Sequence, residues 1–180
     1  SSCIQECTFG DSNLLSGDTC YSLIDQGLTW IQARNYCESL GAHLVSIQTG
    51  QDNNNVQGLS LPNTVWTGLS RDVIGTSVGP WTWEEGQGET SNLTYTNWES
   101  SMPCSDGEIV NEAPGCGGCA NMDASGQWFS RDCDDLHSFV CEYTWDLGQE
   151  GTAPVANIPP QILTLNLQST DSDTPFNTED

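Results

Sequence analysis

Nine cysteines in 180 residues are the side chains of this sequence with the most chemistry to offer. Cys116 and Cys119 have the CxxC spacing of zinc and redox sites, but a single CxxC pair is weak evidence for either chemistry. A cysteine density this high is typical of chains that fold in an oxidising compartment and are held together by disulfides. We therefore expect a secreted, extracellular protein with a disulfide framework.

The histidines and acidic residues do not assemble into a recognisable catalytic set. His43 falls on an expected strand, and His137 follows Asp134 and Asp135 closely enough to form an ion pair in a loop. A Cys/His nucleophile pair is not expected, because most of the cysteines are assigned to disulfides. No pattern indicates a paired acid with the raised pKa that general acid catalysis needs. The sequence therefore predicts a protein that is not an enzyme.

The charge is strongly negative, with 25 acidic residues against three basic ones and a net charge of −22. The phosphates of nucleic acids and of anionic lipids would be repelled, which excludes both as partners. No apolar stretch approaches the roughly 18 residues that cross a bilayer, so no membrane span is expected. The charge is compatible with cationic or mineral partners, but we favour the interpretation that it keeps an extracellular chain in solution.

Two short apolar runs within residues 119–133 predict a β-hairpin. The first run contains Met122 and the second contains Trp128, with Gly126 at the turn between them. Glycine suits a turn that needs a positive φ. A cysteine stands at each end of the segment, so we expect the hairpin to be closed by its own disulfide.

Two helices are predicted by capping signals and apolar spacing. Thr29 and Gln32 have the spacing of a capping box, and apolar residues then recur every three or four positions until Gly41, which suits a helix end. Thr49 would cap a second helix, although the three asparagines at 53–55 are poor helix formers.

The other segments divide into short strands and loops. Residues 1–20 are loop-like. Residues 71–118 are rich in Gly, Pro, Ser, Thr and Asn, and are expected to form a long loop region of the kind that often carries function. Short apolar runs predict an edge strand at 21–24 and further strands at 43–47, 65–69 and 139–143.

The order and spacing of these segments resemble a C-type lectin-like domain in its long form, over about residues 7–145. The resemblance rests on Cys20-Tyr21, the helix at 29–41 with Cys37, residues 42–47, Trp66-Thr-Gly-Leu69, Trp81-Thr-Trp83 with Gly86, Asn97-Trp98, the hairpin with Gly126-Gln-Trp128, and Phe139-Val-Cys141-Glu142. It implies an α+β fold with two helices, two small antiparallel sheets, a long loop region and several disulfides.

The resemblance also implies disulfide pairs, namely Cys37–Cys141, Cys119–Cys133 and, in the N-terminal hairpin, Cys7–Cys20. The first closes a loop of roughly a hundred residues, which corresponds to about 4–5 kcal/mol in the chain-entropy model.

Three cysteines remain, and the sequence leaves their pairing open. Cys104 with Cys116 is the preferred pair, because both fall in the expected loop region. Cys3 is then the odd cysteine, which suggests an intermolecular bond or a free thiol.

In this family the sugar site is a calcium site, and its ligands are missing here. Calcium requires six to eight oxygen ligands. The resemblance places the ligand positions at Met102-Pro103-Cys104, at Gly117-Gly118 and at Phe129-Ser130, where only Pro103, expected in the cis form, is retained. We therefore predict that this calcium and sugar site is lost and that no cofactor is bound. A different ion site built from loop acids is the alternative, although chance clustering is the simpler explanation; the acids are Asp72, Glu84, Glu85, Glu99, Asp106, Glu108 and Glu112.

Asn92-Leu93-Thr94 is an N-glycosylation sequon, so Asn92 is a predicted glycan attachment site.

The C-terminal part predicts a separate element. We divide the chain into the domain at 1–145, a Pro/Gly linker at 146–160, and an extended strand (161–168) with an acidic tail, at 161–180. Three leucines alternate with polar residues on the strand, and each would forgo about 1.5–3 kcal/mol if left in water. They are Leu163, Leu165 and Leu167. The strand could pack back on its own domain, or add to the sheet edge of a neighbour.

These features support two functional hypotheses. The preferred one is an extracellular structural protein that self-assembles into a filament or matrix through its C-terminal strand, with other copies or a neighbouring extracellular protein as partners. The alternative is a secreted lectin that binds glycans at a non-standard or calcium-independent site, with Trp98 and Pro103 as candidate contacts. An acidic protein that binds mineral or ice is a third, weaker hypothesis.

Overall fold

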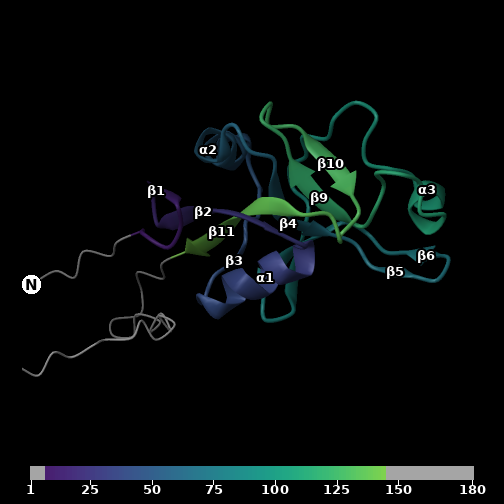
Figure 1. Cartoon of the computed structure of the whole chain (residues 1–180), viewed down its shortest axis with the longest axis horizontal. Coiled ribbons are helices and arrows are strands. Elements are labelled where there is room, and N and C mark those ends of the chain that lie inside the picture. The colour runs from purple at the N-terminus through teal and green to yellow at the C-terminus, as the bar shows by residue number, and fades with distance from the viewer. Residues whose placement is uncertain (1–6, 145–180) are drawn as a thin grey trace, which may run out of the picture.

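The computed structural model describes residues 7–144, which contain three helices and eleven strands (Figure 1). The predicted C-terminal strand, with Leu163, Leu165 and Leu167, lies outside the described residues, as does Cys3.

Both predicted helices form, and each begins at a capping box. Helix α1 (Trp30–Ser39) has Thr29 and Gln32 in reciprocal hydrogen bonds, and Gly41 follows it at a φ of 74°. Helix α2 (Gly50–Ser60) is capped in the same way by Thr49. These side chains satisfy backbone N–H groups that have no partner in the first helical turn.

A third, short helix corrects the expectation of two. Helix α3 (Asp106–Val110) lies within the expected loop region, and Ser105 and Glu108 form its capping box. The Ser-x-x-Glu spacing is visible in the sequence, but the segment has no extended apolar period to accompany it.

The N-terminal strands also differ from expectation. Strand β1 (Ser12–Ser16) pairs with β2 (Thr19–Leu28), which in turn pairs with β11 (His137–Thr144). The segment predicted as an edge strand is therefore interior, and part of residues 1–20 is strand. Gly17 and Asp18 form the two-residue turn, with Gly17 at a φ of 61°, a turn type that favours glycine.

The expected pair of small sheets is replaced by one branched sheet of nine strands and a separate ribbon. The strand that joins the two parts of this sheet is β4 (Val65–Ser70), which pairs in parallel with β11 and antiparallel with one strand from the expected loop region and one strand of the 119–133 hairpin. The other members are β3 (His43–Leu44), β7 (Thr82–Gly86), β8 (Glu89–Asn92), β9 (Cys119–Met122) and β10 (Trp128–Arg131). The ribbon pairs β5 (Val73–Ile74) with β6 (Ser77–Val78).

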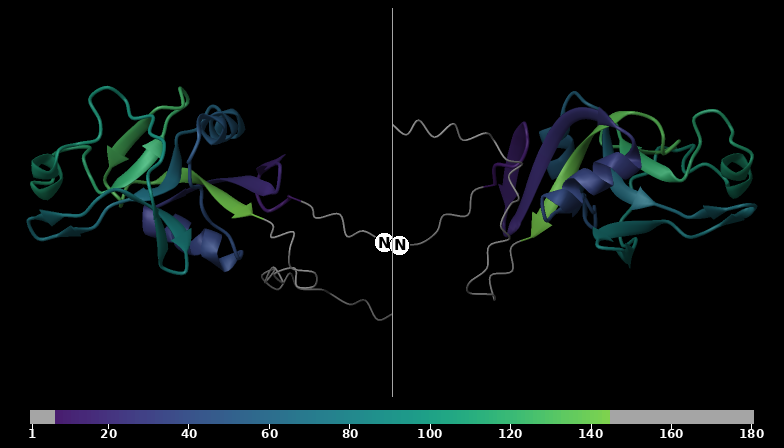
Figure 2. Two further views of the ribbon diagram at one scale, coloured as in Figure 1. Left: turned by 180° about the vertical axis from the view of Figure 1, so that it is seen from behind. Right: turned by 60° about the horizontal axis from the view of Figure 1, so that its bottom comes forward.

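The predicted hairpin is present, since β9 and β10 pair antiparallel with Trp128 opposite Met122. Figures 1 and 2 show α3 and the β5–β6 ribbon together at one end of the molecule, opposite the β1–β2 hairpin. Residues 71–118 therefore contain two β-hairpins and a helix where a long loop was expected.

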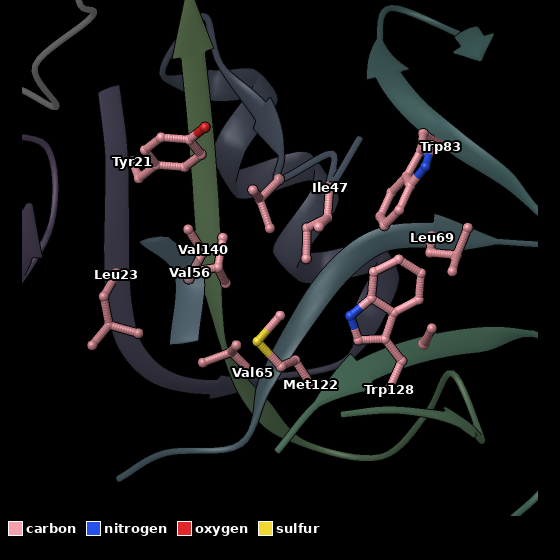
Figure 3. Close-up of a cluster of buried hydrophobic side chains, with 12 residues drawn as sticks. Tyr21, Leu23, Ile47, Val56, Val65, Leu69, Trp83, Met122, Trp128 and Val140 are labelled. Carbon is pink, nitrogen blue, oxygen red and sulfur yellow. The ribbon is translucent and has the colours of Figure 1, made fainter. Parts of the chain in front are cut away.

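Two apolar clusters form the core. One contains Trp83 and Trp128, which meet edge to face at 5.4 Å, together with Met122 and Val56 of α2 (Figure 3). The other packs α1 against the sheet and contains Trp66, whose indole N–H donates to the Leu28 carbonyl at 2.9 Å. Each Trp contributes a large apolar area in a fixed orientation.

The described residues contain four disulfides, joining Cys7 to Cys20, Cys37 to Cys141, Cys104 to Cys116, and Cys119 to Cys133. These are the pairs named from the sequence. Cys37–Cys141 ties α1 to β11 within the second apolar cluster.

Candidate functional site

Side chains and backbone at the positions where the family would hold calcium are hydrogen-bonded to one another. The hydroxyl of Ser130 accepts a hydrogen bond from the Cys104 backbone N–H at 2.8 Å and lies 3.4 Å from the Met102 sulfur, to which it can donate. The Met102–Pro103 peptide bond is cis, as expected. Cys104 is bonded to Cys116, so its sulfur is not a ligand. These side chains offer no carboxylate, and they do not fit calcium.

Gly117, two residues before Cys119, closes the same site in another way. A Cβ atom at Gly117 would lie 2.2 Å from the Arg131 carbonyl oxygen. An acidic side chain therefore has no room at this position unless the backbone moves.

The loop acids are dispersed over separate partners. Asp106 binds Arg71 at 2.8 Å. Glu99 accepts hydrogen bonds from the hydroxyls of Ser100 and Ser101, which lower the pKa of its carboxyl to about 2. Asp106 and Glu99 therefore bind separate partners and do not share an ion site, which agrees with the expectation that the acids cluster only by chance.

One group of potential metal ligands in residues 7–144 has its atoms within 4.8 Å of one another, and it consists of Cys104, Glu108 and Cys116. Its two sulfurs are joined in a disulfide, so they are not thiolates. Glu108 is already the capping residue of α3, and hydrogen bonds from Ser105 lower the pKa of its carboxyl. The group is therefore a structural contact.

Trp98 and Pro103, the candidate glycan contacts, are both partly buried. The Trp98 ring packs against Trp81 at 5.0 Å and against Trp128 at 5.7 Å. Trp98 is held further by its neighbours, since Glu99 N–H donates to the Trp128 carbonyl. These contacts indicate a packing role for Trp98, and its contact with a glycan stays a prediction.

His137 does not form the loop ion pair suggested by the sequence. It stacks edge-on against Trp66 at 4.6 Å, and its Nε2 lies 3.1 Å from Nδ2 of Asn121, so the neutral ring accepts that hydrogen bond. Burial lowers its pKa. The contact of His137 with Trp66 could not be predicted from local sequence, because Trp66 is 71 residues away along the chain.

His43 is a structural residue as well. Its Nδ1–H donates to the Leu44 carbonyl at 2.7 Å, and its Nε2 lies 3.9 Å from Glu85.

Asn92 is exposed at the end of β8, where attachment of a glycan stays a prediction. Cys116 and Cys119 belong to different disulfides, so the CxxC spacing carries no metal or redox site.

A partly buried acid missed by the sequence reasoning is Glu142 on β11. It accepts a hydrogen bond from Ser46 N–H at 2.8 Å, and burial, with Glu85 and Asp52 nearby, raises the pKa of its carboxyl to about 7 against the favourable effect of His43. No sequence signal marks it, since its burial comes from segments far apart in the chain.

The second missed feature is a cavity of about 280 Å³ between α1, the end of β4, and the β7–β8 hairpin. Glu84 lies in its wall with 7% of its surface exposed, and its Oε1 atom has no hydrogen-bond partner among the described residues. Arg34 and Trp30 of α1 line the cavity with it. The signal was available in part: Glu84 follows Trp83 on a strand, where alternation places the two on opposite faces.

Comparisons with known proteins agree with this architecture. The model of the C-type lectin domain family matches residues 26–143. Asialoglycoprotein receptor 2 of Mus musculus is 32% identical over 127 residues, covering 70% of this chain and 39% of the receptor. C-type mannose receptor 2 of Homo sapiens is 34% identical over 150 residues, covering 82% of this chain and 9% of the receptor. The chain thus spans less than half the length of either relative.

Solved structures show the same fold. The carbohydrate-recognition domain of cow CD23, determined in the presence of a GlcNAc2Man3 oligosaccharide, superposes with a TM-score of 0.60 at 28% identity, covering 77% of this chain and 97% of that one. A calcium-independent type II antifreeze protein gives a TM-score of 0.60 at 23% identity, covering 74% and 92%, and this supports the fold alone.

The expected α+β C-type lectin-like fold is confirmed by these comparisons. Within residues 7–144, no helix has the length and hydropathy needed to cross a membrane. From the family match, the two receptors and the disulfide-linked fold, it follows that this chain belongs to the C-type lectin domain family.

Proposed function

We propose that this chain is a non-enzymatic, secreted recognition module that binds glycans without calcium in the loop site. The observation that carries the proposal is the position of Ser130, whose hydroxyl joins Met102 and Cys104 where calcium would need oxygen ligands. A site closed by its own side chains has no vacancy for a cation.

Relatives supply the ligand class. Two of them are receptors whose names refer to asialoglycoprotein and to mannose, and the CD23 domain was solved with an oligosaccharide present. The antifreeze protein is described as calcium-independent, which supports the compatibility of this fold with a calcium-free state. Glycan recognition by a different surface would agree both with the relatives' glycan ligands and with the loss of the calcium ligands in this chain.

The test is a glycan array probed with the full chain, once with calcium and once with EDTA. We expect the same glycans to be bound in both. A calcium-dependent lectin on the same array serves as the control for chelation and should lose its signal. Binding abolished by EDTA would contradict calcium independence, and the absence of binding to any glycan would contradict the proposed function.

The second candidate function is self-assembly through the C-terminal strand. It is supported by the alternation of Leu163, Leu165 and Leu167 in a chain that otherwise completes its domain by residue 145, before the linker at 146–160. The odd Cys3 supplies a thiol for an intermolecular disulfide. These residues lie outside the described part of the chain. Sedimentation velocity of the full chain and of a variant lacking 158–180 tests it: the deletion should abolish oligomers, and an unchanged oligomer would refute it.

A further inference from the structure

We infer that the outer edge of β1, together with the groove between β1 and α2, is the surface that receives residues 161–168 of a second copy of this chain. The inference rests on the second candidate function, self-assembly, and names the part of the neighbouring domain that the strand would bind. The sequence predicts residues 161–168 as a strand with one apolar face. A docking surface for such a strand must offer an unpaired sheet edge and an apolar lining beside it.

Strand β1 offers the sheet edge. It stands at one end of the sheet, and within residues 7–144 it pairs with β2 alone (Figure 1). Ser16 and Thr19 flank a two-residue turn and therefore form a hydrogen-bonded pair, and such pairs alternate with pairs whose backbone groups point outward. The backbone N–H and C=O groups of Asn13 and Leu15 thus point away from β2, toward the position that an added strand would take.

The groove beside this edge supplies the apolar lining. It has a volume of about 340 Å³ and lies between β1 and α2, which pack against each other. Leu14 and Leu59, both partly buried, contact the first apolar cluster and also line the groove. A strand added next to β1 would continue the faces of the sheet, so alternate side chains would lie over the groove. Leu163, Leu165 and Leu167 form such an alternating row.

The charge of the groove favours the same occupant. The chain has 25 acidic residues, yet none of the groove's lining residues is charged. Besides the two leucines, the lining consists of Asn13, Asn54, Asn55 and Gly58. Residues 161–168 are also uncharged, so this strand and this groove can meet without the repulsion that acidic segments of two copies would experience.

The opposite end of the sheet is a poorer match. Strand β8 is the edge strand there, and it contains Glu89 and the sequon residue Asn92. The cavity beside it is lined by Glu38, Glu85 and Glu89, and by no leucine, isoleucine or valine. Three leucines docked at that edge would face carboxylates in place of an apolar surface, so β1 is the better acceptor.

The place where the C-terminal segment begins is compatible with exchange between copies. Strand β11 ends at Thr144, opposite Thr19 of β2, and Thr19 lies opposite Ser16 of β1. The segment therefore begins about two strand spacings, roughly 10 Å, from the edge of β1. Residues 145–160 can span at most about 50 Å. Two copies that lie edge to edge can thus each reach the β1 strand of the other.

The experiment follows hydrogen exchange of the β1 amides by two-dimensional ¹H–¹⁵N NMR. The observed chain is labelled with ¹⁵N and has serine in place of the three strand leucines, so its own strand cannot dock. The substitutions are Leu163→Ser, Leu165→Ser and Leu167→Ser. When unlabelled wild-type chain is added as the donor, exchange at Asn13 and Leu15 should slow at least about tenfold, because their N–H groups become hydrogen-bonded. The Leu14 amide already points toward β2 and should change by less than about twofold.

The control for this titration is an unlabelled donor that carries the same three substitutions, and it should slow neither amide. A groove variant then tests the acceptor by sedimentation velocity. Leu59→Asn should weaken oligomer formation at least about tenfold, because an amide replaces apolar lining. Leu61→Asn makes the same change at a leucine that is 53% exposed and outside the groove, and should leave assembly within about twofold.

A second acceptor variant covers the case in which Leu59→Asn does not fold. Leu15→Pro removes one outward N–H from β1 while leaving the hydrogen bonds to β2 in place, and it should also weaken assembly at least about tenfold. Thermal unfolding of each variant verifies that the folded state is retained.

The outcomes separate this inference from self-assembly itself. If deletion of 158–180 abolishes oligomers, but the donor leaves Asn13 and Leu15 exchange unchanged and both acceptor variants assemble normally, the strand binds elsewhere. The inference is then overturned while self-assembly stands. Protection of these amides in wild-type monomers, without any effect of an added donor, would mean that the strand binds its own domain and would also overturn the inference. A full chain that forms no oligomers overturns both.

Discussion

The indole N–H of Trp128 donates a hydrogen bond to Oδ1 of Asn53 at 2.8 Å, which fastens the Cys119–Cys133 hairpin to helix α2. The Asn53 amide also donates to the Gly126 carbonyl at 3.1 Å, at the hairpin turn. Asn53 is buried, although it is a poor helix former. Its place in α2 is therefore explained by the hairpin that it holds.

Replacing Asn53 tests this connection. Asn53→Ala should lower the free energy of unfolding by about 2 kcal/mol, because the buried Trp128 N–H is left without a partner. Asn54→Ala, at an exposed position of the same helix, is the matched control and should be neutral or slightly stabilising, because alanine favours helix. Urea unfolding of both variants gives the difference. Equal stabilities would mean that the Trp128 hydrogen bond contributes nothing.

Sequence reasoning predicted the parts of the fold whose signals are local. Thr29 and Gln32 mark a helix start within four residues, and the β9–β10 hairpin is marked by its turn glycine and its flanking cysteines. Strand β1 was missed although Gly17-Asp18 marks its turn, because its apolar pattern is weak. The joining of the strands into one sheet could not be predicted, because it depends on β4 meeting β11 in parallel.

At the candidate site, the sequence predicted only that the calcium ligands are missing. Missing oxygen ligands at Met102 and Ser130 are visible in the sequence, whereas the contact between these two residues requires the fold. Glu84 was named as one of several loop acids, and its burial beside Arg34 depends on packing between α1 and β7. One acid among 25 cannot be singled out without that packing.

The closed loop site makes a second prediction. Ser130→Ala should lower the free energy of unfolding by about 1–2 kcal/mol, because the buried Cys104 N–H loses its acceptor. Hydrogen exchange at the Cys104 amide should become faster at the same time. Ser77→Ala, at an exposed position of the β5–β6 ribbon, is the control and should change neither quantity. Unaltered exchange at Cys104 in Ser130→Ala would show that the hydroxyl does not close the site.

The disulfides should differ in their contribution according to the loops that they close. Cys37–Cys141 spans 104 residues and Cys104–Cys116 spans 12. In the chain-entropy model these correspond to about 4.7 and about 3 kcal/mol, so replacing the first pair by alanine should be the more destabilising. Urea unfolding of the two double variants measures both. A larger loss for Cys104→Ala with Cys116→Ala would show that local packing, not loop closure, decides their contribution.

Glu142 should make stability depend on pH between about 4.5 and about 7. The pKa of its carboxyl is about 7 in the folded chain, against 4.5 for an unperturbed glutamate, so the folded state binds a proton more tightly than the unfolded state. Its contribution is therefore fully present below pH 4.5 and is lost as the pH rises through 7.

Glu142→Gln isolates this effect from the general repulsion among the chain's acids. The neutral amide can still accept the Ser46 N–H, so wild type and variant should be similarly stable near pH 4.5. At pH 8 the variant should be the more stable by about 2 kcal/mol, a value reduced from the full shift because the side chain is only partly buried. Glu89→Gln removes an equal charge from an exposed position and should give a much smaller difference. Urea unfolding at both pH values decides the matter, and a variant less stable than wild type at pH 8 would mean that the ionised Glu142 is favoured by His43 more than it is disfavoured by burial.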